Sequence, residues 1–214
     1  MGVGYLSTVV FTEVPRRVIS CTCRSSLNAT RDLLVVVSIN VQSLSPSTLD
    51  NLLVEVRERS LDVLLLCETW HDGDSVSIRR LRAEGFRVIE RARPRSRRAE
   101  AQLTVNHGGV AIFAAAGVRL TSVDVGVQPA TFECVAGRLT SGTSSCVVVV
   151  VYRRGSWAVT SEFFTELADM LDRLSTFVDP LVLAGDVNIR FDRPSDPHAV
   201  SLSPATVSRS TYVK

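Results

Sequence analysis

The stretch PLVLAGDVN, residues 180–188, joins a buried apolar run to a polar signature, and three other stretches of the chain have the same design. These are LLVVVSIN at 33–40, LDVLLLCET at 61–69 and CVVVVVY at 146–152. Runs so dense in Leu, Val and Ile predict strands that are buried on both faces. The chain is therefore expected to form an α/β fold.

Each of the four runs delivers a polar side chain where its strand is expected to end. These side chains belong to Asn40, Glu68, Tyr152, and Asp186 with Asn188. Polar groups at the ends of neighbouring buried strands converge at one edge of a sheet, where α/β folds place ligands and chemistry. The four ends together predict an active site.

The elements between these runs favour a mixed sheet. A helix is expected after Ser45-Pro46, with Leu49, Leu52, Leu53 and Val56 as its apolar stripe, and a second over about 161–174, with Phe164, Leu167, Ala168, Leu171 and Leu174 aligned. Shorter strands are expected near 86–90, 108–114, 118–124 and 131–139, with no helix between them. Consecutive strands of this kind argue against a simple doubly wound sheet.

Composition sets the class of the protein. A length of 214 residues with 45% hydrophobic content suits one globular domain. We expect an extension at 1–30, the domain at 31–200 and a disordered tail at 201–214. No apolar run approaches the roughly 20 residues of a membrane span, and five scattered cysteines are no disulfide framework, so we expect an intracellular, non-secreted protein without a membrane partner.

Arginine supplies nearly all of the positive charge. The net charge is only +2, and Lys214 is the sole lysine, but nine arginines lie between 79 and 98. Arginine suits phosphate contacts, so the stretch RARPRSRR, residues 91–98, is either a DNA-backbone contact or a solvated loop. Candidate DNA contacts are Arg93, Arg95, Arg97, Arg98 and Arg153.

The residue types at the strand ends suit metal-assisted chemistry. Glu68 beside the amide of Asn40 is a hard-oxygen site of the kind Mg²⁺ takes, with Mn²⁺ as an alternative ion. Asp186 would then orient or deprotonate a water, Asn188 would hydrogen-bond a phosphoryl oxygen, and Tyr152 would steady the phosphate or the leaving oxygen. These roles predict hydrolysis of a phosphodiester.

The order SIN, CETW, GGVAIF, VVYRRGS and GDVN resembles the endonuclease/exonuclease/phosphatase superfamily, and more closely the apurinic-endonuclease-like domain of non-LTR retrotransposons. The resemblance covers about residues 33–200. It implies a four-layer α/β sandwich of two mixed sheets packed face to face with helices outside, Mg²⁺ dependence, and nicking of double-stranded DNA by a nuclear protein joined to a reverse transcriptase. It also assigns the family's metal-binding Glu, active-site Tyr and Asp-x-Asn to Glu68, Tyr152, Asp186 and Asn188, and its first-motif Asn to Asn40.

One part of the family pattern is absent. Members end with further strands and an Asp-His pair, which this chain lacks, so we expect the C-terminal strands to be missing and activity to be impaired. Two alternatives stay open: an inert transposon remnant, and a phosphoinositide or phosphomonoester phosphatase.

Several further side chains are expected to have ordinary structural roles. Trp70 and Trp157 are expected to be buried, with stacking on a nucleotide base as the alternative. His71 and His107 are expected at the surface, and Glu133 is expected to be structural.

Overall fold

The computed structural model describes residues 34–73, 75–94, 106–189 and 197–198. It also describes the backbone of Leu33 and of three strands, β1 (Ser7–Phe11), β2 (Ile19–Arg24) and β11 (Ser210–Tyr212). Within these described residues, no helix is both long enough and apolar enough to cross a membrane.

The strands form two mixed sheets. The first has the order β11, β1, β10, β9, β8, β7, and the second has the order β2, β3, β4, β6, β5. The bounds of the first sheet's remaining strands are β7 Arg119–Val123, β8 Glu133–Ser141, β9 Ser144–Tyr152 and β10 Leu181–Asp186. Those of the second are β3 Leu33–Asn40, β4 Val63–Cys67, β5 Arg87–Arg91 and β6 Val110–Ala114.

Parallel pairing explains why the polar strand ends gather. β9 runs parallel to β10, and β3 runs parallel to β4. Each pair therefore ends at one edge of its own sheet, and the other neighbours in these sheets include antiparallel pairs such as β8 with β9. The mixed direction expected from the sequence is confirmed.

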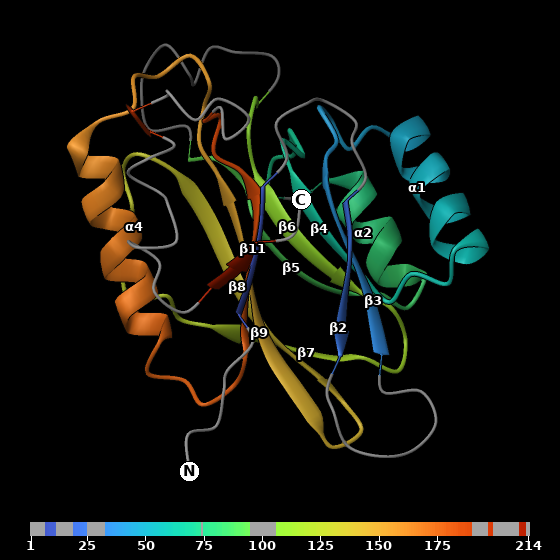
Figure 1. Ribbon diagram of the computed structural model, residues 1–214. Helices are drawn as coiled ribbons and strands as arrows, with labels where there is room; N and C mark the ends of the chain where they lie inside the picture. Colours follow the sequence, from blue (N-terminus) through green and yellow to red (C-terminus); the bar gives the residue numbers. More distant parts are fainter. Residues whose placement is uncertain are drawn as a thin grey trace.

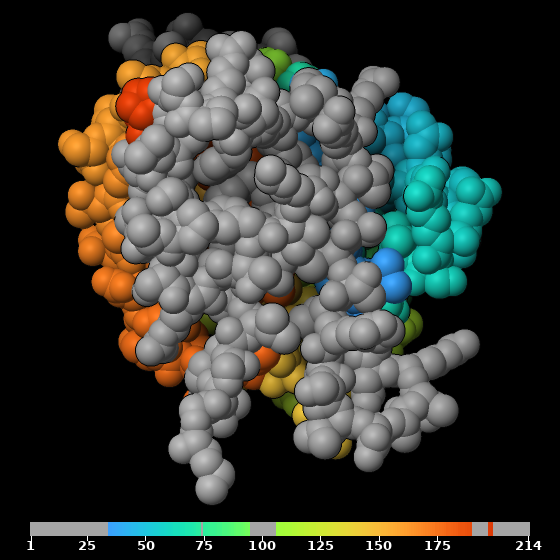
Figure 2. Space-filling model, viewed as in Figure 1, coloured from blue at the N-terminus to red at the C-terminus, as the bar shows by residue number. Residues whose placement is uncertain are grey.

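Three apolar cores separate four layers. One core lies between the two sheets, a second joins the first sheet to helix α4 (Ser161–Leu174), and a third joins the second sheet to helices α1 (Pro46–Glu58) and α2 (Val76–Ala83). Figure 1 shows α4 on one outer side and α1 with α2 on the other, and the space-filling view places α4 and α1 at opposite edges (Figure 2). The expected four-layer sandwich is confirmed.

Helix α1 begins and packs as its sequence predicts. The hydroxyl oxygen of Ser45 accepts a hydrogen bond from the Thr48 N–H at 3.2 Å, and Pro46 follows at the first helical position. The buried residues of the helix are Leu49, Leu52, Leu53 and Val56.

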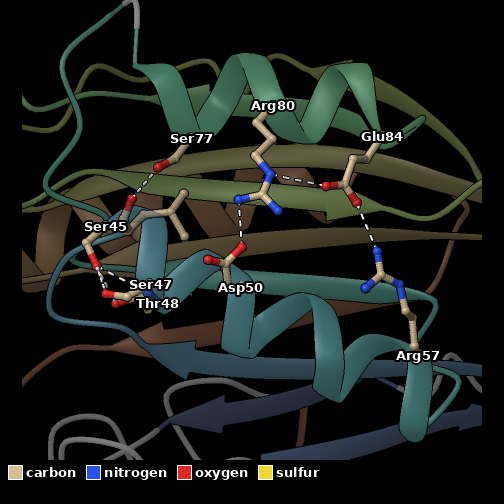
Figure 3. Close-up of polar contacts among 9 residues, drawn as sticks. Ser45, Ser47, Thr48, Asp50, Arg57, Ser77, Arg80 and Glu84 are labelled. Atoms are coloured by element: carbon tan, nitrogen blue, oxygen red, sulfur yellow. Dashed lines mark hydrogen bonds and ion pairs between the residues drawn. The ribbon is translucent and has the colours of Figure 1, made fainter.

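Helix α2 is not anticipated by the sequence analysis. Its Ser77 hydroxyl donates to the Leu44 carbonyl at 2.7 Å, which ties its first turn to the segment before α1. Arg80 contacts Asp50 of α1 at 2.6 Å and Glu84 at 3.2 Å (Figure 3). These exposed pairs contribute little each, so Ile78 and Leu81, which are buried, anchor the helix.

Helix α4 has the predicted bounds but a different buried face. Phe163, Leu167, Met170 and Leu174 are buried, whereas Phe164 and Leu171 are half-buried and Ala168 is exposed. The expectation is confirmed for Leu167 and Leu174 and wrong for the rest of the stripe, because Phe163 and Met170 are the other residues that pack in the core beneath the sheet.

Two segments expected outside the core contribute strands. Within 1–30, β1 pairs with β10 and β2 pairs with β3, and within 201–214, β11 pairs with β1. Both sheets thus extend further than the apolar runs alone indicate. The domain boundaries at 31 and 200 stay a prediction.

Candidate active site

The strand ends of both sheets meet in one hydrogen-bonded cluster. Asn40 ends β3 and Glu68 directly follows β4 in the second sheet, while Tyr152 ends β9 and Asp186 ends β10 in the first. Tyr152 and Asp186 are paired in register on neighbouring strands. The sequence-based expectation that these side chains come together agrees with this arrangement.

The amide of Asn40 connects the two sheets. Its Nδ2 donates to Glu68 Oε1 at 2.9 Å and to Asp186 Oδ2 at 3.0 Å. The side-chain oxygen of Asn40 accepts a hydrogen bond from the Gln42 N–H at 3.3 Å. Because Asn40 is buried, its amide holds two carboxylates together at the place where the sheets meet.

The turn after β10 fixes the carboxylate of Asp186. Its Oδ1 accepts a hydrogen bond from the Asn188 N–H at 2.9 Å, which is the Asx-type turn that a GDVN sequence favours. Gly185 has φ of +134°, and a Cβ there would overlap the Val151 carbonyl oxygen, so only glycine fits. Both oxygens of Asp186 are therefore held by one hydrogen bond each.

Asn188 does not lie as an extended segment would place it. Its φ of +52° is left-handed, and its Nδ2 donates to the Arg153 carbonyl at 2.7 Å. The amide nitrogen therefore braces the loop after β9, and any contact to a phosphoryl oxygen would fall to the rest of this exposed side chain.

Arg153 is buried and fastens two loops. Its guanidinium donates to the carbonyls of Val187 at 2.6 Å, Asn188 at 2.8 Å and Trp157 at 2.6 Å, and also to that of Arg154. A guanidinium occupied in this way has a structural role, and we leave Arg153 out of the proposed DNA contacts.

Burial sets the ionisation of the cluster. It raises the pKa of Asp186 above its usual value, against the opposing effect of the hydrogen bonds from Asn40 and Asn188. Burial also raises the pKa of Tyr152, and the negative charge of Glu68 adds to the rise. The phenol of Tyr152 is thus a hydrogen-bond donor at neutral pH.

Glu133 is a member of the site that the sequence analysis treats only as structural. It pairs in register with Tyr152, accepts a hydrogen bond from the Gly109 N–H at 2.5 Å, and forms an ion pair with Arg93. The guanidinium carbon of Arg93 lies 5.7 Å from the centre of the Tyr152 ring. Burial raises the pKa of Glu133, and Arg93 opposes the rise. No sequence pattern marks this pair, because its members are 40 residues apart.

The loop that carries Glu68 is supported by a buried histidine. The expectation that His71 lies at the surface is wrong: it is buried, with Nδ1 2.6 Å from Thr69 Oγ1 and Nε2 3.0 Å from Glu90 Oε2. The β5 carboxylate that meets it is 19 residues distant, so local spacing does not reveal it. His107 is exposed, as expected.

The side chains fit a hard cation at Glu68 only in part. Glu68 is partly exposed and offers carboxylate oxygen, but the amide of Asn40 presents its N–H groups to both carboxylates and its oxygen to the backbone. In the described part of the chain, no group of three or more His, Cys, Asp or Glu side chains could hold a metal ion. Among these groups only the Glu68 carboxylate matches Mg²⁺, which keeps several waters and needs one or two carboxylates, and Asn40 positions that carboxylate.

The structure describes only some of the other residues that the sequence suggested as DNA contacts or buried aromatics. Arg93 lies in the site, but Arg95, Arg97 and Arg98 lie outside the described residues. The expectation of burial is wrong for Trp157, which is 36% exposed, whereas Trp70 is half-buried and packs edge-on against His107.

Comparison of the chain with known proteins gives a result only at the level of structure. No family model and no curated protein matches the sequence. Among solved structures, the endonuclease domain of TRAS1, a telomere-specific non-LTR retrotransposon, is 14% identical with a TM-score of 0.56, over 81% of this chain and 70% of that one. The human Nocturnin catalytic domain with bound sulfate is 18% identical with a TM-score of 0.52, over 78% and 68%.

A third structure is D. rerio TDP2 complexed with a single-strand DNA product. It is 15% identical with a TM-score of 0.50, over 73% of this chain and 61% of that one. Identities this low compare folds and not activities. With its two face-to-face mixed sheets and outer helices, the chain shares the fold of these solved structures.

Proposed function

We propose that this protein hydrolyses phosphodiester bonds with the help of a divalent cation, as a DNA-nicking endonuclease of the non-LTR retrotransposon type. The observation that carries the proposal is the Asn40 amide, which donates to Glu68 and Asp186 at once. Bringing two carboxylates together at the meeting point of two sheets serves no evident packing purpose, and it is the arrangement that hydrolysis by a positioned water requires.

Asp186 is the proposed proton acceptor. Each of its oxygens accepts one hydrogen bond within the protein, which leaves a lone pair on each for a water. A raised pKa makes the carboxylate of Asp186 a better base than an ordinary aspartate. Asp186 would thus orient a water and take its proton as the water attacks phosphorus.

Glu68 is the proposed ligand of Mg²⁺, or of Mn²⁺ in its place. The bound ion would supply charge stabilisation for the phosphoryl oxygens. The hydrogen bond from Asn40 fixes the direction of the Glu68 carboxylate. Glu68 has a φ of +51°, a left-handed backbone conformation that residues other than glycine rarely adopt. Backbone conformations of this kind are frequent at functional sites.

Arg93 and Tyr152 are the proposed contacts to the substrate. Glu133 holds the guanidinium of Arg93 beside the Tyr152 ring, so a positive charge stands next to the phenol donor. Positive charge and an O–H donor are complementary to a phosphate group. Arg95, Arg97 and Arg98 would continue the contact along the DNA backbone.

The choice of double-stranded DNA as substrate, and of a reverse transcriptase as covalent partner, rests on the order of the sequence motifs. The structural likeness to the TRAS1 endonuclease domain supports it. A phosphomonoester or phosphoinositide substrate would use the same carboxylates, and the inert-remnant alternative would use none of them.

A plasmid assay separates these alternatives. The purified chain should nick supercoiled plasmid with Mg²⁺ but not with EDTA, and Asp186→Asn should reduce the rate by at least about a hundredfold. Asp169→Asn makes the same chemical change on the exposed face of α4 and should leave the rate unchanged. Release of phosphate from soluble phosphate esters without nicking would favour a phosphatase, and no reaction with either substrate would refute the proposal.

A further inference from the structure

We propose that Trp157 and Arg154 form a platform on which an unpaired base of the substrate strand stacks, beside the candidate active site. This inference deepens the proposed function and rests on it. It assigns a binding role to the segment between β9 and α4, which carries none of the residues proposed above for the chemistry.

The position of the platform follows from its hydrogen bonds to the site. Trp157 lies five residues after Tyr152. Between them, the Arg153 N–H donates to the Asp186 carbonyl at 2.9 Å, and the Arg153 carbonyl accepts from Asn188 Nδ2 at 2.7 Å. The platform is therefore joined directly to the turn that holds the proposed base, Asp186.

The segment is rigid enough to present a binding surface. The Arg153 guanidinium is buried, and it donates to the carbonyl of Trp157 at 2.6 Å as well as to those of Val187 and Asn188. Gly155 lies against Asn188, because a Cβ at Gly155 would come within 2.8 Å of the Asn188 side-chain oxygen. A clamped loop loses little conformational entropy when a ligand binds.

The exposed face of the loop has the chemistry of a nucleotide contact. Trp157 is 36% exposed, although an indole of this size is usually well buried. The guanidinium carbon of Arg154 lies over the Trp157 ring, 5.2 Å from its centre, so a delocalised cation stacks on a large aromatic surface. Base stacking on an aromatic ring, with arginine nearby for the phosphate, is how single strands are held without regard to sequence.

This geometry selects a form of DNA. A base can stack on Trp157 only after it has left the stack of its own duplex, so the platform favours single-stranded, frayed or gapped DNA over an intact duplex. The proposed substrate is thus DNA with an unstacked nucleotide close to the scissile phosphate.

Binding measurements on an Asp186→Asn background test the inference without cleavage. The probes are a fluorescein-labelled oligo-dT and a blunt duplex of the same length, followed by fluorescence anisotropy with Mg²⁺ present. Trp157→Ala should weaken oligo-dT binding about tenfold, and Trp157→Phe should weaken it much less. Val178→Ala removes an exposed apolar side chain elsewhere and should change nothing.

Trp157→Ala should weaken binding of the blunt duplex by less than twofold. Unchanged oligo-dT affinity in Trp157→Ala would overturn the inference, as would an equal loss on duplex and single strand. A thermal melt of each variant identifies any loss that comes from unfolding, and Trp157→Phe then decides the result.

The inference and the proposed function fail in different ways. If the unmodified chain nicks no plasmid but Trp157→Ala still loses oligo-dT binding, the platform stands and the hydrolytic function falls. If the chain nicks plasmid and Trp157→Ala binds and nicks as well as the parent, the function stands and the platform falls.

Discussion

Replacing Asn40 by alanine removes the hydrogen bonds that link the two sheets and leaves the carboxylates of Glu68 and Asp186 without the amide between them. The two hydrogen bonds from Asn40 go to charged acceptors, which contribute about 1.5–3 kcal/mol each. Glu68 is partly exposed, so water can replace part of the hydrogen-bond energy that this carboxylate loses. We therefore expect Asn40→Ala to lower the free energy of unfolding by about 3 kcal/mol, which lowers Tm by roughly 6–12 °C for a chain of this size.

The loss should depend on pH. Without the amide, the negative charge of Glu68, which already raises the pKa of Asp186, acts on that carboxylate with less opposition. The destabilisation should therefore be largest at neutral pH and should shrink in acid, where Asp186 takes up a proton. Asn40→Asp should behave in the same direction and more strongly, because it adds a third carboxyl group of the same shape.

Urea denaturation in EDTA, at neutral and at mildly acidic pH, measures this effect without interference from a metal ion. Asn51→Ala, an exposed change of the same type on α1, is the matched control and should shift the midpoint only slightly. If Asn40→Ala unfolds at the urea concentration of the unmodified protein at both pH values, the cluster contributes no stability and our account of it is refuted.

Two further predictions concern the neighbouring loops and the proposed base. Arg153→Met should lower the free energy of unfolding by about 3–5 kcal/mol, since it leaves the carbonyls of Val187, Asn188 and Trp157 without their donor. Arg138→Met, at a half-buried arginine, should lower it by less, and equal urea midpoints would contradict this. The raised pKa of Asp186 predicts that stability and nicking rate change in opposite directions with pH. The stability that this group contributes is full below its unfolded pKa and is lost as pH rises through its folded pKa. The nicking rate should rise over the same window, because the proposed base becomes ionised. Urea midpoints and initial nicking rates over pH measure both trends, and a stability profile unchanged in Asp186→Asn would argue against the raised pKa.

The parts of the fold that the sequence predicts are those with a local signal. The apolar runs ending at Asn40, Cys67, Tyr152 and Asp186 are strands because residues buried on both faces must be apolar throughout. Within each sheet the ends converge because parallel neighbours finish at the same edge, whereas the contact of Asn40 with Asp186 depends on how the two sheets pack.

The elements that the sequence does not predict have weak local signals. In α2 only Ile78 and Leu81 are large buried apolar residues, and its arginines obscure the helical period. Strands β1 and β2 lack a long apolar run, and their pairing with β10 and β3 is a long-range choice that propensity does not determine.

The site residues that the sequence misassigns are those whose partners are distant in the chain. The ion pair of Glu133 with Arg93, and the burial of His71 against Glu90, exist only after the sheets have packed. The same holds for Arg153, because a charged residue after a strand is usually exposed, and only the turn at 187–188 supplies the carbonyls that bury it.

The contact of Asn40 with both sheets also determines how the candidate site can be lost by mutation. The cluster takes Asn40 and Glu68 from one sheet and Asp186 from the other, so neither sheet alone contains the complete site. A deletion or frameshift that removes either sheet would abolish the site in a single event, whereas substitutions on the outer helices would accumulate with little effect.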